Sequence, residues 1–103
     1  MQIGPQKFPF IASSLEGKGK LTLSTTSTLV SFTMRPTTIV LTSDVNNTDM
    51  IYYGGSSLDS SGSGAVGYLS AGDSITLNYD TKNNNLYVIA ASGNQYLWAG
   101  AFQ

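Results

Sequence analysis

The last twenty residues constrain the fold most, because they hold two apolar segments that do not alternate with polar residues. These segments are Asn85–Ala91 and Gln95–Phe102, joined by the turn Ser92–Asn94. Successive side chains of a β-strand point to opposite faces, so a strand with one wet face alternates apolar and polar residues. Both faces are apolar here. We therefore predict a terminal β-hairpin covered on both faces, either inside a sandwich or by a neighbouring subunit.

The larger side chains of this hairpin are candidates for a subunit or partner interface. Residues two apart in a strand share a face, so one face of each strand can line the core while the other meets a partner. The hairpin candidates are Tyr87, Ile89, Tyr96, Trp98 and Phe102.

The first eighteen residues indicate an extended arm. They contain two prolines, which remove backbone donors and disfavour a central strand. Phe8, Phe10 and Ile11 need a surface to cover them, either this subunit's own sheet or that of a partner, and they complete the candidate interface. We predict an arm over residues 1–18 and a β-sandwich domain over residues 19–103.

The composition favours one folded all-β domain. Only 11 % of the 103 residues are charged, against the usual quarter or so, while 41 % are hydrophobic. Six Tyr, four Phe and one Trp argue against low-complexity disorder. A chain of this length can bury a single core without disulfides, and it has no cysteine.

Alternating segments between residues 20 and 79 predict the other strands. In Ser74–Tyr79, Ile75, Leu77 and Tyr79 share the apolar face. Turn-forming residues recur about every 8–12 residues, and no segment has a sustained helical period. We predict a single small sandwich or jelly-roll-like barrel of about eight short strands.

The residue types disfavour catalysis and cofactor binding. The chain has no His and no Cys, so it lacks the usual general base, the commonest metal ligand and any thiolate. Five of its six carboxylates fall in predicted turns, where Asp is expected for structural reasons. We expect a non-enzymatic protein without catalytic, metal-binding or cofactor-binding residues.

Two loops allow other interpretations. Asp44–Asp49 spaces oxygen-bearing side chains somewhat like a calcium loop, but it lacks the Gly and Glu of an EF-hand, so an Asx-turn loop is the main interpretation. Gly54–Gly64 is rich in Gly and Ser, but it contains no Lys or Arg and no helix follows it. We predict a mobile surface loop there rather than a phosphate cradle.

The charges point to protein partners. The net charge of −1 combines +3 over residues 1–35 with −4 over residues 36–103, which suits self-association and is too little positive charge for nucleic acid. The longest apolar run, Leu86–Ala91, is too short to span a bilayer. The first ten residues lack the apolar region of a signal peptide, so we expect assembly in the cytoplasm.

The aromatic residues allow one further interpretation. Rings on a sheet face can stack on sugars, although aromatic residues also fill sandwich cores. The residues considered for a sugar-binding face are Tyr52, Tyr53, Tyr68, Tyr87, Tyr96 and Trp98.

Three segments carry a family resemblance: Met50–Ser57, Gly67–Leu77 and Leu86–Ser92, followed by the Trp-bearing last strand. Over Thr37–Gln103 the chain resembles small β-domains encoded among the structural genes of tailed bacteriophages, of the capsid-decorating or virion-attached kind. The resemblance implies a virion structural protein, often a homotrimer, located in the virion.

We therefore expect a capsid decoration or cement subunit that associates with itself and docks on the major capsid protein or another virion protein. The alternative is a carbohydrate- or receptor-binding module of a phage tail or cell surface.

Overall fold

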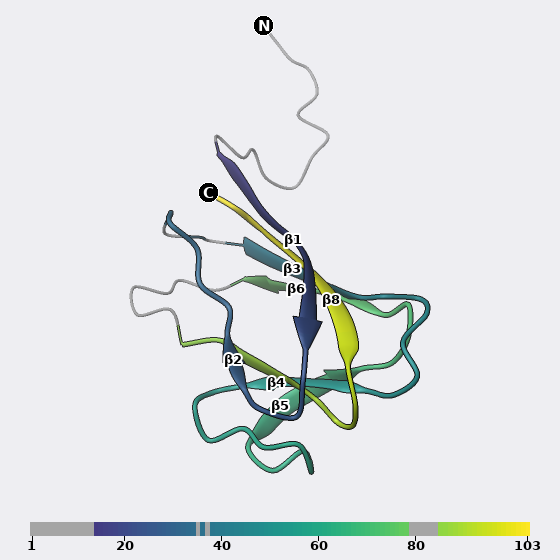
Figure 1. Ribbon diagram of the computed structural model, residues 1–103. Coiled ribbons are helices and arrows are strands. Elements are labelled where there is room, and N and C mark those ends of the chain that lie inside the picture. The colour runs from purple at the N-terminus through teal and green to yellow at the C-terminus, as the bar shows by residue number, and fades with distance from the viewer. Residues whose placement is uncertain (1–13, 35, 37, 79–84) are drawn as a thin grey trace, which may run out of the picture.

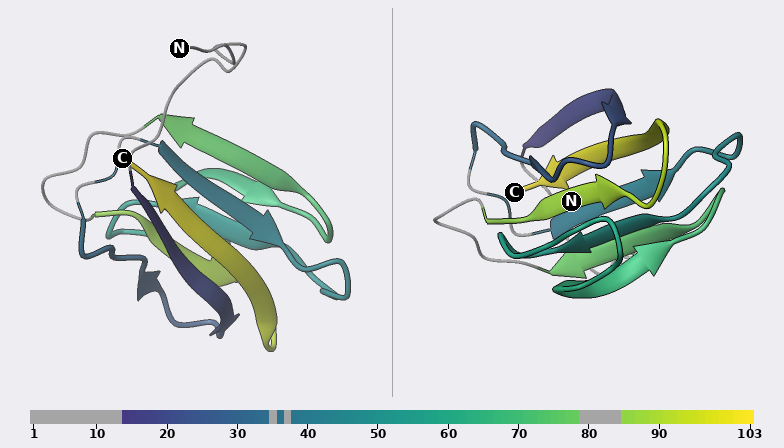
Figure 2. Two further views of the ribbon diagram at one scale, coloured as in Figure 1. Left: turned by 90° about the horizontal axis from the view of Figure 1, so that it is seen from above. Right: turned by 60° about the horizontal axis from the view of Figure 1, so that its bottom comes forward.

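Eight strands form two four-stranded antiparallel sheets that pack face to face (Figures 1 and 2). The computed structural model describes residues 14–34, 36, 38–78 and 85–103. The all-β prediction is confirmed, and the two sheets make an open sandwich rather than a closed barrel. The strands are β1 (Leu15–Leu23), β2 (Thr28–Leu29), β3 (Thr38–Ser43), β4 (Ile51–Gly54), β5 (Ala65–Leu69), β6 (Ser74–Asn78), β7 (Tyr87–Ala90) and β8 (Gln95–Phe102).

The strand order shows that the predicted terminal hairpin is wrong. The first sheet has the order β1-β8-β3-β6, and the second sheet has the order β2-β7-β4-β5. The turn after β7 therefore carries the chain from one sheet to the other, with Gly93 in the left-handed region at φ +56°. Both strands are central in their sheets, so each has backbone partners on both edges and needs no pairing with the other.

Alternating residues from both sheets fill the core. Strand β8 buries Leu97, Ala99 and Ala101 and turns Tyr96, Trp98 and Phe102 outward, as its spacing predicts. In β6, Ile75 and Leu77 pack against the core, again as predicted, whereas Tyr79 lies outside the described residues. The fully or nearly fully buried core side chains include Leu23, Ile39, Leu41, Ile51, Leu69, Val88 and Ala90.

The predicted boundary between residues 18 and 19 falls within strand β1. Strand β1 begins at Leu15 and pairs along its length with β8, with an irregularity between Gly17 and Gly19. Residues 1–13 of the predicted arm lie outside the described residues. Residues 15–18 belong to the sandwich because they lie in β1, which pairs with β8.

Glu16 fixes this first part of β1 to the chain that follows β2. Its carboxylate accepts hydrogen bonds from the backbone N–H groups of Thr33 (3.0 Å) and Met34 (3.2 Å), and from the Thr33 hydroxyl (2.9 Å). Lys18 lies 3.8 Å from the same carboxylate. The Thr33 N–H is the main reason that the pKa of Glu16 is below its ordinary value.

Candidate functional site

The predicted interface residues fall on opposite faces of the sandwich. The outer face of the first sheet, here called the Trp98 face, carries Tyr96, Trp98 and Phe102 of β8. Tyr87 and Ile89 of β7 lie on the outer side of the second sheet. The remaining three, Phe8, Phe10 and Ile11, lie outside the described residues. The described candidates therefore make two separate surfaces instead of one.

The Trp98 face presents a partly exposed indole at its centre. Trp98 lies on β8 between Lys20 of β1 and Thr42 of β3, and 44 % of its surface is exposed. Its Nε1–H donates a hydrogen bond to Oδ1 of Asp44 at 3.1 Å. The Lys20 ammonium lies 4.8 Å from the centre of the Tyr96 ring, close enough for a cation–π contact. The indole is thus held in place without being covered.

Several side chains with hydroxyl groups share the outer face with this indole. Thr42 and Ser74 are cross-strand neighbours, and their hydroxyls lie 3.0 Å apart. Thr22 lies opposite Tyr96, and Thr76 of β6 belongs to the same outer face. The Trp98 face therefore combines an aromatic ring with small polar groups, and it carries little charge.

Two amides fix the loop that supplies Asp44. Asn47 accepts a hydrogen bond from Tyr96 N–H and donates one to the Tyr96 carbonyl, both at 2.8 Å. The buried Gln95 side chain accepts from the N–H groups of Thr48 (2.8 Å) and Asp49 (3.1 Å). Sequence reasoning missed both roles, because the pattern of Asn and Asp residues signals a turn without showing which strand the turn packs against.

The carboxylates of this loop are engaged in local hydrogen bonds. The Trp98 N–H, followed by the Asn46 backbone N–H, lowers the pKa of Asp44. The Ser92 hydroxyl and the Met50 N–H lower the pKa of Asp49. Within the described ranges, no three His, Cys, Asp or Glu residues are grouped so that they could hold a metal ion.

The outer face of the second sheet, here called the Tyr68 face, is apolar and aromatic. Its edge strands expose Leu29 (41 %) and Tyr68 (59 %). Tyr87 is opposite Leu29, and Tyr52 is opposite Tyr68. None of the four strands of this sheet contains a charged residue.

The loop after β4 covers part of the Tyr68 face. Gly62, at φ +91°, lies against the ring of Tyr52, where an added Cβ would be 3.1 Å from a ring carbon. Tyr52 is opposite Ile89, which is only 2 % exposed although it lies outside the sandwich core. Leu58 of the loop is also buried outside that core. Ile89 is therefore not available to a partner.

Asp59 organises the same loop. Its carboxylate accepts hydrogen bonds from the N–H groups of Ser61 (2.9 Å) and Ser63 (3.2 Å), and the hydroxyl and N–H of Ser61 lower its pKa. The segment predicted to be a mobile surface loop thus has its own turns and a buried leucine. A run of Gly and Ser residues predicts a loop, but it does not show that Leu58 within the loop is buried.

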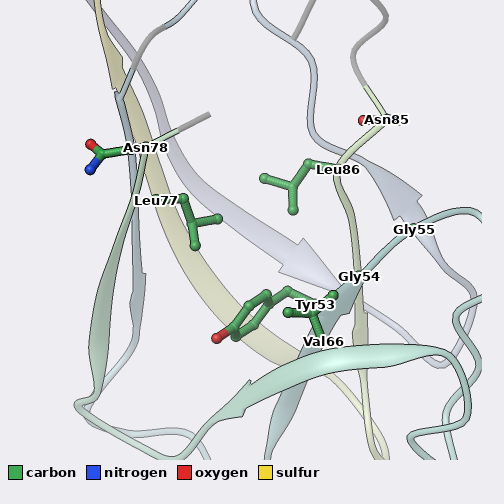
Figure 3. A pocket seen from close by; sticks show the side chains of 8 residues that line it. All are labelled: Tyr53, Gly54, Gly55, Val66, Leu77, Asn78, Asn85 and Leu86. Atoms are coloured by element: carbon green, nitrogen blue, oxygen red, sulfur yellow. The ribbon is translucent and has the colours of Figure 1, made fainter. Parts of the chain in front are cut away.

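A cavity of about 330 Å³ opens between the two sheets near β4 and β6 (Figure 3). Its walls are mainly apolar and include Tyr53, Leu77 and Leu86. Asn78 and Asn85, which also line it, border residues 79–84, outside the described part of the chain. The described residues of its walls include no acidic or basic side chain, so we assign no chemistry to it.

Tyrosines considered for a sugar-binding face are also divided by the fold. Tyr53 is buried in the core, whereas Tyr52, Tyr68 and Tyr87 belong to the second sheet. Only Tyr96 accompanies Trp98 on the first sheet. Of these tyrosines, only Tyr96 could therefore contact a sugar that stacks on Trp98.

Comparisons with known proteins add no family to this description. Among the described residues no helix is long and apolar enough to cross a membrane. No protein-family model, no curated protein and no solved structure matches the chain.

Proposed function

We propose that this protein is a non-enzymatic structural subunit of a bacteriophage particle, a capsid decoration or cement protein that docks through its Tyr68 face. The observation that carries the proposal is the absence of charged residues from all four strands of the second sheet. Cores of protein interfaces are depleted of charge and enriched in Tyr. The resemblance to virion proteins supplies the expected partner, the major capsid protein or another virion protein.

The exposed apolar side chains at the edges of this face support its use as a docking surface. Leu29 and Tyr68 are exposed on the two edge strands, while Ile89 on the strand between them is covered by the loop after β4. Apolar patches of this kind on a soluble protein mark interaction sites. The same face also suits self-association, and a homotrimer is the assembly that we propose.

Two aspartate substitutions on opposite faces test the proposal. Tyr68→Asp introduces a charge into the Tyr68 face, and Thr76→Asp introduces the same charge into the Trp98 face at an exposed position. Purified variants would be added to particles of the encoding phage, prepared from a strain that lacks this gene, and bound protein would be measured after sedimentation. Multi-angle light scattering would give the oligomeric state of each variant.

We expect Tyr68→Asp to bind particles at least tenfold more weakly and to shift the trimer toward monomer, while Thr76→Asp behaves as the unsubstituted protein. Thermal melting by circular dichroism verifies that both variants are folded. If the unsubstituted protein is a monomer that does not sediment with the particles, the proposed function is wrong. Equal binding by the two variants would contradict the assignment of the Tyr68 face.

A further inference from the structure

The Trp98 face has a chemistry that the proposed docking surface does not use. Trp98 is the only tryptophan of the chain, and it lies on a central strand with 44 % of its surface exposed. A large aromatic ring on a central strand would contribute more to stability inside the core. Its position and partial exposure instead make one side of the indole accessible to a ligand.

The indole is held in a fixed orientation. The bond from Nε1–H to Asp44 is 3.1 Å long, and the Asp44 carboxylate also accepts from the Asn46 N–H at 3.1 Å. The Asp44 backbone N–H in turn donates to the Tyr96 carbonyl at 3.0 Å, next to Trp98 in β8. A ring that is fixed before binding loses little conformational entropy when a ligand binds. A small contact area can therefore be enough for binding.

The groups around the indole suit a ligand with many hydroxyls. Thr42 and Ser74 continue the row of side chains that contains Trp98, and their hydroxyls can both donate and accept hydrogen bonds. Lys20, on the other side of Trp98, adds an ammonium donor. An apolar ring bordered by such groups matches a pyranose, which presents C–H groups on its ring face and hydroxyls at its rim.

The charge of the face selects among ligands. Asp44 places a carboxylate at the edge of the indole, and hydrogen bonds from Trp98 and Asn46 favour its ionised form. Lys20, on the other side of Trp98, carries the opposite charge, so the face offers no net attraction to nucleic acids or acidic polysaccharides. An uncharged ligand does not depend on such attraction.

We propose that the Trp98 face is a binding site for neutral β-1,4-linked glycans, in which one pyranose stacks on the Trp98 indole and the hydroxyls of Thr42 and Ser74 bind its rim. In β-1,4-linked glucose and N-acetylglucosamine the substituents are equatorial, so the ring faces carry only C–H groups. The site is independent of docking through the Tyr68 face, because the two surfaces lie on opposite sides of the sandwich (Figure 2).

Fluorescence of the single tryptophan reports directly on this site. Cellohexaose and chitohexaose would be titrated into the purified protein, with dextran as an α-linked control. We expect a saturable change in the intensity and wavelength of Trp98 emission in the millimolar range or below with at least one β-linked hexasaccharide, and none with dextran. If neither β-linked sugar changes the emission, or if dextran acts equally well, the proposal is wrong.

Affinity electrophoresis in gels containing hydroxyethylcellulose or glycol chitin tests variants without relying on tryptophan emission. Trp98→Ala should abolish the retardation, and Tyr68→Ala, a matched aromatic substitution on the opposite face, should leave it unchanged. Thr42→Arg keeps the tryptophan but places a guanidinium beside its ring, so it should also abolish retardation if Trp98→Ala fails to fold. Retardation that survives in folded Trp98→Ala or Thr42→Arg, or that occurs only in alginate gels, would overturn the assignment.

Discussion

Gly67→Ala should destabilise the sandwich, although replacing a strand glycine usually does the opposite. Gly67 lies opposite Tyr53 in the β4–β5 pair, and a Cβ at this position would be 2.7 Å from Cζ of the tyrosine ring. Overpacking of this kind lowers the free energy of unfolding by about 1–3 kcal/mol. Replacing a strand glycine with alanine otherwise raises it by about 0.5–1 kcal/mol. Because the Tyr53 ring lines a cavity into which it can shift, we expect a net loss of about 1 kcal/mol.

The matched control is Gly55→Ala, where no atom lies within 4 Å of the added Cβ. This substitution should leave stability unchanged or raise it by about 0.4–1 kcal/mol. For a domain of this size, a loss of 1 kcal/mol lowers the melting temperature by about 4–8 °C, which thermal circular dichroism resolves easily.

A double variant identifies the cause of the loss. Tyr53→Phe removes the hydroxyl that lies nearest to the added methyl group, so it should relieve part of the clash when combined with Gly67→Ala. The two substitutions should then be non-additive by at least about 0.5 kcal/mol. If Gly67→Ala melts at or above the temperature of the unsubstituted protein, or if the effects simply add, the packing argument is refuted.

Three other predictions concern stability and are measured by urea or thermal denaturation. Glu16 has a lowered pKa in the folded state, so the stability that it contributes is present above its ordinary value of 4.5 and is lost as the pH falls through the folded value. Glu16→Gln should therefore be less stable than the unsubstituted protein at pH 7, and this difference should shrink as the pH falls below 4.5; an equal difference at neutral and acidic pH would contradict this. Leu97→Ala, at a fully buried position, should cost about 2–5 kcal/mol, and a smaller loss would show that the core collapses around the site. Gln95→Leu keeps the apolar volume but leaves the Thr48 N–H without its acceptor, so we expect a loss of about 1–3 kcal/mol, and an unchanged stability would show that water replaces the amide.

Periodicity in the sequence was enough to predict the faces of the strands but not their partners. The inward positions of Leu97 and Ile75 follow from alternation, because a strand in a sandwich must bury one face. The false hairpin arose because a three-residue turn containing glycine fits both a hairpin and a crossing between sheets. Which of the two forms depends on backbone partners such as β1 and β4, which are remote in sequence and leave no local signal.

The candidate sites depend on contacts that are still more remote. Asp44 and Trp98 are 54 residues apart, so nothing in either segment predicts their hydrogen bond. The doubly apolar character of β7 has a similar cause: the loop containing Leu58 and Gly62 folds over the outer side of its sheet, so Ile89 is buried by this chain rather than by a neighbour. The sequence showed that Ile89 needed cover without showing what covers it.

The division of β7 and β8 between two sheets leads to a final prediction. A hairpin would have gathered the aromatic residues on one surface, whereas the observed topology gives an uncharged Tyr68 face and a hydroxyl-rich Trp98 face. If each face serves its own partner, Tyr68→Asp should weaken particle binding without changing glycan binding, and Trp98→Ala should do the reverse. The double variant should show both losses at their single-variant size, because distant sites without shared contacts are additive. Particle sedimentation and affinity electrophoresis on the same four proteins measure both activities. A single substitution that abolishes both in a folded protein would mean that the two faces do not act independently.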